Sequence, residues 1–182
     1  MKRILALTLI PTAAFAHPGG HFDQPFLSGL LHPFSGADHL LAMFAVGLWA
    51  SVTGGRAIWA MPLAFVLALL TGGALGASGV ALPMVEPMIL ASILLLGGAT
   101  ALALRPDLAV SLLWVAVFGL AHGFAHGAEG PAQGWALYAL GFVGACASLN
   151  AIGLGLGLVL TSRLIRALGG ATAVAGLAMA FA

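Results

Sequence analysis

Long apolar runs follow one another through most of this 182-residue chain. Hydrophobic residues make up 62% of the sequence and charged residues only 6%, whereas about a quarter of the residues in an ordinary globular domain are charged. A soluble fold of this size could not cover its surface with so few charges. The composition therefore predicts an all-α membrane protein, because a helix satisfies its own backbone polar groups inside the bilayer.

Residues 1–16 have the pattern of a cleaved signal peptide. They combine a positive start (Lys2 and Arg3), an apolar stretch and an A-x-A cleavage site at residues 14–16. The alternative is a first transmembrane helix, but the apolar stretch is shorter than the roughly 20 residues that span a bilayer, and Pro11 interrupts it. The mature chain would then begin outside the cytoplasm.

Small, polar and proline-containing breaks divide the rest of the chain. We expect a periplasmic, histidine-containing segment over residues 17–35, followed by a transport domain of six transmembrane helices over residues 36–182. The helices are predicted at residues 36–53, 57–76, 83–104, 108–126, 134–161 and 164–182. Most of these lengths suit a bilayer core about 30 Å thick. The predicted fold class is thus a six-helix transmembrane bundle after a cleaved signal peptide.

The arginines indicate how this bundle is oriented. A cleaved signal peptide leaves the mature N-terminus outside, so the loops after the first, third and fifth helices face the cytoplasm. Those loops, together with the first turn of the sixth predicted helix, hold every lysine and arginine of the mature chain, namely Arg56, Arg105, Arg163 and Arg166. The positive-inside rule and the signal peptide therefore agree. We predict a bacterial inner-membrane protein whose mature N-terminus and C-terminus are both periplasmic.

Two polar clusters lie far apart in this apolar sequence, and the predicted topology brings both to the outer face. They consist of His32, Asp38 and His39 in the first cluster, and His122, His126 and Glu129 in the second. Imidazoles and carboxylates are costly in a bilayer, so they indicate a functional site. Both groups are ligands of divalent transition metals. We therefore predict that these six residues hold a metal ion between the first and fourth helices.

The spacing within the second cluster supports this prediction. On a helix, His122, His126 and Glu129 share one stripe, because separations of three and four residues return to the same face. A histidine pair four residues apart can bind one metal ion, and a carboxylate one turn on can ligate the ion or orient an imidazole. Glycines recur every four residues beside this stripe, from Gly119 to Gly127, which allows a neighbouring helix to approach closely. The structural alternative is that the histidines only form interhelical hydrogen bonds.

Other polar residues leave alternatives open. Ser35 and Asp38 could form a weak capping box, but a capping box leaves the histidines unexplained, so we interpret Asp38 as a ligand or as the partner of a ligand. Asn150 either extends a polar route inward or acts as a hydrogen-bonding contact between helices. Cys146, the single cysteine, excludes an internal disulfide and is expected to pack as a small apolar residue. Either His17 and the histidine at position 21 capture metal together, or they have no specific role.

The sequences HPFSGADHLLAMFAVGLWA and LAHGFAHGAE resemble the two signature motifs of the HupE/UreJ family of nickel/cobalt permeases. The first matches the family's H-x5-D-H element at residues 32–39, and the second matches its H-G-x-A-H-G-x-E element at residues 122–129. One departure is Ala121, at a packing position where Phe is expected. The resemblance covers the whole mature chain and implies uptake of Ni²⁺ or Co²⁺.

We therefore expect a secondary permease that moves divalent transition-metal ions from the periplasm to the cytoplasm, and not an enzyme. Nickel or cobalt is expected, while imidazole and carboxylate ligands also suit Zn²⁺ and Cu²⁺. The chain has no phosphate-binding loop for a nucleotide and no basic run for nucleic acid. We expect no tightly bound cofactor, and a homo-oligomer is possible. The alternatives are a membrane protein that binds b-type haem between two histidines, a copper or zinc handling protein, and an intramembrane enzyme.

Overall fold

The computed structural model describes residues 24–131 and 133–181, and these residues form helices and connecting turns without any strand. The helices are α1 (Pro25–Leu31), the 3-10 helix η1 (His32–Phe34), α2 (Ala37–Thr53), α3 (Ala57–Ala77), α4 (Val85–Ala101), α5 (Leu108–Glu129), α6 (Trp135–Val159) and α7 (Ser162–Ala180). The all-α fold class is therefore confirmed for the described part of the chain. The predicted signal peptide, His17 and His21 lie outside the described residues.

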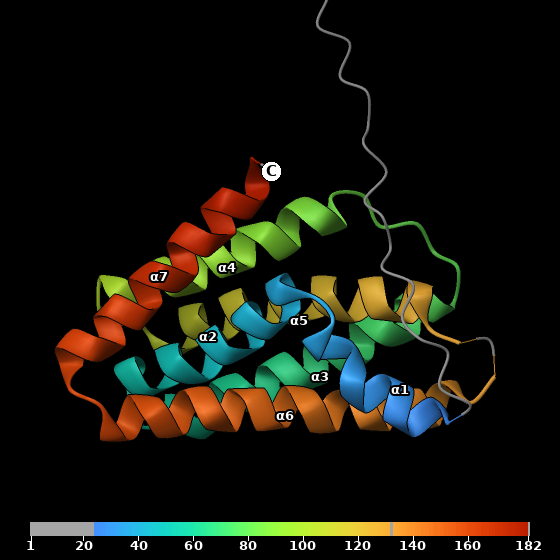
Figure 1. The fold of residues 1–182 in the computed structure, drawn as a ribbon, viewed down its shortest axis with the longest axis horizontal. Helices are drawn as coiled ribbons and strands as arrows, with labels where there is room; N and C mark the ends of the chain where they lie inside the picture. Colours follow the sequence, from blue (N-terminus) through green and yellow to red (C-terminus); the bar gives the residue numbers. More distant parts are fainter. Residues whose placement is uncertain (1–23, 132, 182) are drawn as a thin grey trace, which may run out of the picture.

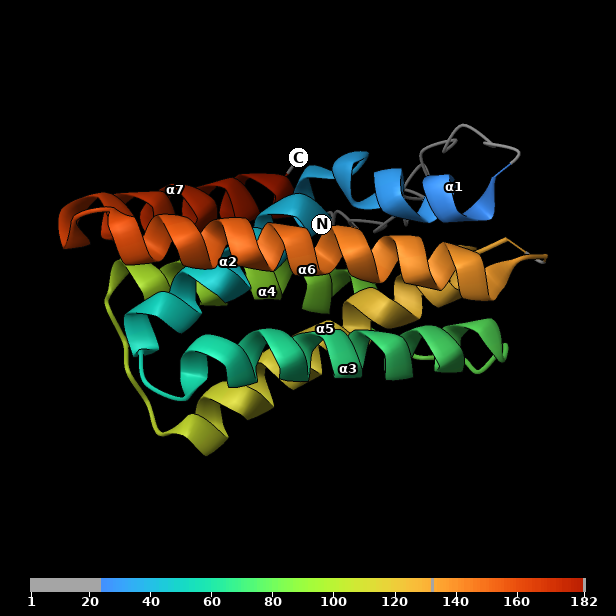
Figure 2. The ribbon, with the colours of Figure 1, turned by 90° about the horizontal axis from the view of Figure 1, so that it is seen from below.

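The helices run side by side along the long axis of the molecule (Figures 1 and 2). The main packing partners are α3 with α5, α4 with α7, and α2 with α6. Figure 2 shows α3 and α5 along one side of the bundle and α6 and α7 along the other. Helix α2 lies between them, and its Met43, Leu48 and Trp49 are fully buried. This central position makes α2 the helix around which the others pack.

Over residues 24–131 and 133–181, four helices, α3, α5, α6 and α7, are long and apolar enough to cross a membrane. A fifth candidate is the pair formed by α1–η1 and α2, which is bent by 81° at the break between them. Helix α4 is apolar but has only 17 residues, fewer than the roughly 20 that a full span needs. The structure is therefore that of a helical membrane protein with four to five candidate spans. Each of the six predicted apolar segments corresponds to a helix whose ends differ from the prediction by no more than one turn.

Helix α1 is a feature that the sequence analysis did not predict. Pro25 occupies the first turn of α1, where its missing N–H is not needed. A Cβ atom at Gly29 would collide with the backbone carbonyl of Tyr138 on α6, and a Cβ atom at Gly141 with that of Phe26. Helix α1 therefore packs against the first half of α6 at backbone contact.

Helix α2 continues along the second half of α6. A Cβ atom at Gly47 would collide with the carbonyl oxygen of Asn150, and a Cβ atom at Gly153 would collide with that of Phe44. The break between α1–η1 and α2 thus lies beside the middle of α6 (Figure 1). The polar residues of the first cluster lie at this break and are partly buried, and α1 precedes them along α6.

The predicted glycine series on α5 makes the close approach expected of it, and the neighbouring helix is α3. Cβ atoms at Gly123 and Gly127 would collide with the backbone carbonyl oxygens of Leu69 and Gly73. Small residues let helix backbones touch in this way. The contact also fixes the rotation of α5 about its axis, and therefore the direction in which the neighbouring histidines point.

The arginines of the described residues gather at one end of the bundle, as predicted for the mature chain. The α2–α3, α4–α5 and α6–α7 connections all lie at the left end of Figures 1 and 2. These connections and the first two turns of α7 carry Arg56, Arg105, Arg163 and Arg166. Arg166 also donates a hydrogen bond of 2.8 Å from Nε to the carbonyl oxygen of Ala101, which ties α7 to the end of α4.

Candidate metal centre

The break between α1 and α2 positions the first predicted cluster. His32 is the C-cap of α1 and begins η1, while Asp38 and His39 lie in the first turn of α2. The capping box considered from the sequence is wrong. The residue before α2 is Gly36, which has no side-chain cap, and the Ser35 hydroxyl instead donates to the carbonyl oxygen of His32 at 2.6 Å.

Asp38 holds His39 by two contacts. Its Oδ1 atom lies 2.7 Å from the Nδ1 atom of His39 and accepts the backbone N–H of His39 at 2.8 Å. A carboxylate on one ring nitrogen fixes the tautomer and leaves the lone pair of the other nitrogen for a metal ion. The Nε2 atom of His39 is buried and has no hydrogen-bond partner among the described residues. The geometry therefore suits Asp38 as the residue that orients His39.

The second cluster lies near the end of α5, on the side that faces the break. His122 is fully buried and His126 is 3% exposed. The Nδ1 atom of His122 donates to the carbonyl oxygen of Phe118 at 2.8 Å. Within the part of the chain that the structure describes, the Nε2 atom of His122 and both ring nitrogens of His126 have no hydrogen-bond partner. Glu129, the last residue of α5, is exposed.

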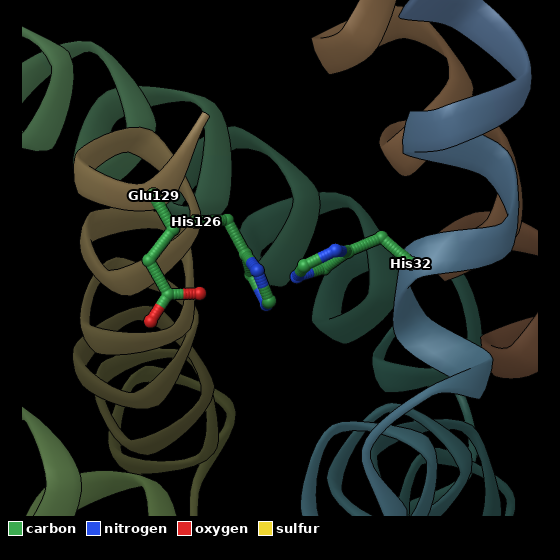
Figure 3. Close-up of side chains that lie close together, drawn as sticks. All are labelled: His32, His126 and Glu129. Carbon is green, nitrogen blue, oxygen red and sulfur yellow. The ribbon is translucent and has the colours of Figure 1, made fainter. Parts of the chain in front are cut away.

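The structure brings the two clusters together. The ring centroid of His126 lies 4.3 Å from that of His39 and 4.7 Å from that of His32, and the centroid of His122 lies 5.2 Å from that of His39. Ligand atoms of His32, His126 and Glu129 lie within 4.8 Å of one another. Figure 3 shows the side chains of His32 and His126 pointing toward each other, with the Glu129 carboxylate near the ring of His126. We name these four histidines with Asp38 and Glu129 the histidine cluster.

The unpartnered nitrogens of the histidine cluster are its main chemical feature. The atoms are His39 Nε2, His122 Nε2, and Nδ1 and Nε2 of His126. Each buried polar atom left without a partner costs about 1–3 kcal/mol, so four of them in one place need a common explanation. Imidazole nitrogens with carboxylates form a donor set for nickel, cobalt, zinc or copper(II). A bound cation of this class would satisfy several of these atoms at once.

Helix α6 adds two aromatic residues that the sequence analysis missed. The ring of Phe142 lies 4.1 Å from that of His126, and the ring of Tyr138 lies 5.8 Å from that of His32. Both are almost completely buried. Aromatic residues are common in apolar helices, so only the status of Tyr138 as the single tyrosine of the chain distinguished it in the sequence.

Comparison with known proteins agrees with the motifs. The family model described as "HupE / UreJ protein" matches residues 5–179. The chain is 43% identical over 180 residues to Protein HupE of Rhizobium leguminosarum bv. viciae, an alignment that covers 96% of this chain and 94% of the relative. No solved structure matches the chain. The chain therefore belongs to the HupE/UreJ family.

Proposed function

We propose that this protein is a permease that carries divalent transition-metal ions, nickel or cobalt in the first place, from the periplasm to the cytoplasm. Membership of the HupE/UreJ family implies a nickel/cobalt transport-type function. The observation that carries the proposal is the convergence of the two motifs on one set of unpartnered imidazole nitrogens. We propose His32, His39, His122, His126 and Glu129 as ligands or transient ligands, with Asp38 orienting His39.

The burial of these residues suggests how a hydrated ion enters. Glu129 is exposed, His32 is partly buried, His126 is 3% exposed and His122 is fully buried. An ion that meets the carboxylate first can exchange its waters for imidazole nitrogens one after another as it moves inward. The two carboxylates of the cluster offset the charge of a divalent ion, which lowers the cost of taking that charge into the bundle.

The same donor set favours transition metals over the more abundant alkaline-earth ions. Mg²⁺ and Ca²⁺ prefer oxygen ligands, and Mg²⁺ gives up its waters reluctantly. Imidazole nitrogen suits nickel, cobalt, zinc and copper(II), and intrinsic affinity alone favours copper. Discrimination among these ions must therefore come from the geometry of the cluster and from which ions are available.

We propose that the bundle crosses the inner membrane six times after removal of the signal peptide. In this arrangement α1–η1–α2 is one broken span and α4 is a short span. The end that carries the arginines faces the cytoplasm, in accordance with the positive-inside rule, and both mature termini are periplasmic. The histidine cluster then lies in the outer part of the membrane. Its broken helix is of a kind that membranes tolerate where it lines a binding site.

The spacing of the rings argues against the haem alternative. Two axial histidines bind iron from opposite faces of a porphyrin, whereas His39 has ring centroids of His126 and His122 at 4.3 Å and 5.2 Å. These rings are too close for a macrocycle to fit between them. Purified protein that is colourless and binds Ni²⁺ would agree with this reasoning, and a Soret band would contradict it.

Radiometal uptake tests the proposed function directly. Vesicles that contain the purified protein are given ⁶³Ni²⁺, and Co²⁺, Zn²⁺ and Cu²⁺ are added as competitors. We expect uptake that excess Co²⁺ inhibits, and we expect His126→Ala to abolish it at normal membrane abundance. Ser78→Ala is the matched control, because the exposed Ser78 hydroxyl bonds only its own helix at Leu75. Uptake that is unchanged in His126→Ala, or absent in the unaltered protein, would refute the proposal.

A further inference from the structure

Asn150 on α6 is a buried polar residue whose hydrogen bonds are incomplete. It is 2% exposed, and its Oδ1 atom has no partner among the described residues. Its Nδ2 atom lies 3.8 Å from the Sγ atom of Cys146, which is fully buried. The buried serine and threonine hydroxyls each bond a backbone carbonyl three or four residues earlier in the chain, namely those of Ser92, Thr100, Ser111 and Thr172. Asn150 is therefore unlike the other buried polar side chains outside the histidine cluster and its surroundings.

The place of Asn150 relates it to the histidine cluster. Phe142, Cys146 and Asn150 recur every four residues, so they follow one face of α6. Phe142 contacts His126, with ring centroids 4.1 Å apart, which fixes the level of the histidine cluster on this helix. At a rise of 1.5 Å per residue, Cys146 and Asn150 lie about 6 Å and 12 Å farther along α6. That direction leads to the end of the bundle that carries the arginines.

Helix α2 packs against this part of α6. A Cβ atom at Gly47 would collide with the carbonyl oxygen of Asn150, so the two helix backbones touch at this level. Cys146 also belongs to the central apolar core together with Met43 and Phe142. The amide and the sulfur are thus enclosed inside the bundle, between the histidine cluster and the arginine end. An ion that leaves the histidine cluster inward has to pass this level.

We propose that the amide oxygen of Asn150 is a second, transient binding site for the transported cation, on the inner side of the Phe142 ring. This inference rests on the proposed transport function. The oxygen is buried and has no hydrogen-bond partner among the described residues, and a carbonyl oxygen is one of the donors that divalent ions accept. It brings no negative charge, so the site holds the ion more weakly than the histidine cluster does. Conduction needs such weak intermediate sites, because an ion that binds too tightly cannot leave.

Asn150→Leu tests the proposal, because leucine has a similar size and lacks the amide. Removing an unpartnered oxygen does not destabilise the fold in the way that removing a bonded one does. We expect the maximal rate of ⁶³Ni²⁺ uptake into proteoliposomes to fall by roughly ten-fold or more, while the equilibrium affinity of the purified protein for Ni²⁺ is unchanged. Ser148→Ala is the matched control, since the exposed Ser148 on the same helix bonds only the carbonyl of Gly144. It should transport normally.

A wild-type maximal rate in Asn150→Leu, at normal abundance, would overturn the inner site and leave the proposed function standing. Absence of both Ni²⁺ binding and Ni²⁺ uptake in the unaltered protein would instead remove the proposed function, and this inference with it. A loss of Ni²⁺ affinity in Asn150→Leu equal to its loss of rate would also overturn the inner site, because the residue would then act through the histidine cluster.

A second measurement takes its decisive result from the unaltered protein, and that result does not depend on how Asn150→Leu folds. The purified protein is titrated with Co²⁺ well beyond the concentration that fills the histidine cluster. We expect a second, weaker phase of Co²⁺ absorption to appear in this range, and to be absent in Asn150→Leu. Absorption of the unaltered protein that saturates once the histidine cluster is full would overturn the inner site.

Discussion

Replacing Asp38 with asparagine removes the negative charge beside His39 and leaves the size of the side chain almost unchanged. In the structure, Oδ1 of Asp38 lies 2.7 Å from Nδ1 of His39 and accepts its backbone N–H at 2.8 Å. An asparagine oxygen can keep the backbone bond, but it is a weaker acceptor for the ring N–H and makes the imidazole less basic. The substitution therefore tests one role of Asp38, the orientation and polarisation of His39.

The size of the effect follows from what such partners contribute elsewhere. Loss of a residue that orients a metal ligand typically costs 10–100-fold in metal affinity, which corresponds to about 1.4–2.8 kcal/mol of binding free energy. We expect Asp38→Asn to raise the dissociation constant for Ni²⁺ by that factor. Membrane abundance should stay normal, because Asp38 is 27% exposed at its side chain and its partner is the adjacent residue.

The assay is equilibrium dialysis of the purified protein with ⁶³Ni²⁺, followed by the concentration dependence of uptake in proteoliposomes. The dissociation constant and the half-saturating concentration should rise together. An affinity within about two-fold of the unaltered protein, a change of less than about 0.5 kcal/mol, would refute the orienting role. Complete loss of binding, equal to that in His126→Ala, would show instead that Asp38 ligates the ion directly.

Two further predictions concern pH and packing. Uptake at fixed membrane potential should fall as the external pH falls below about 6. The reason is that ligating imidazoles must be neutral, so protons compete with the metal ion. Constant uptake between about pH 7.5 and 5.5 would contradict imidazole ligation. Gly123→Ala should lower the free energy of unfolding of the purified protein by roughly 1–3 kcal/mol through overpacking, and its melting temperature with it. The reason is that the added Cβ atom would collide with the carbonyl oxygen of Leu69. Gly98→Ala is its control, since a Cβ atom there meets nothing within 4 Å, and equal melting temperatures for the two variants would refute the close α3–α5 contact.

Much of the helix pattern could be predicted from the sequence because a run of apolar residues between breaks is a strong signal. The ranges at α3 and α6 differ from the prediction only at their ends. The orientation of the histidine stripe on α5 was also predictable, because separations of three and four residues fix a face regardless of tertiary packing. The two motifs then identified which segments had to meet.

Helix α1 was not predictable in the same way. It has seven residues, too few to produce a span-length signal, and its stability depends on glycine contacts with α6 that hydropathy does not reveal. The 81° bend likewise arises from tertiary packing around the His32–Phe34 turn. Its consequence is that the partly buried first cluster lies at a break in the chain, with α1 before it and α2 after it.

Which faces of the other helices are buried could not be predicted from the sequence, for a general reason. A membrane helix is apolar toward the lipid and toward its neighbours alike, so periodicity does not indicate which side is buried. The contacts of Phe142 and Tyr138 with the histidines could therefore only come from the structure. The sequence reveals Asn150 as a polar residue in an apolar helix. It does not reveal that the oxygen of Asn150 is unpartnered, or how far along α6 the residue lies from the histidine cluster.

The central claim is that residues near 32–39 and residues near 122–129 share one ion. Equilibrium dialysis with ⁶³Ni²⁺ on the unaltered protein, His39→Ala, His126→Ala and the double variant tests it as a thermodynamic cycle. We expect one tightly bound ion per unaltered protein, loss of that ion in each single variant, and little further loss in the double variant. A tight ion retained by both single variants and lost only in the double variant would show two independent sites and contradict the shared centre.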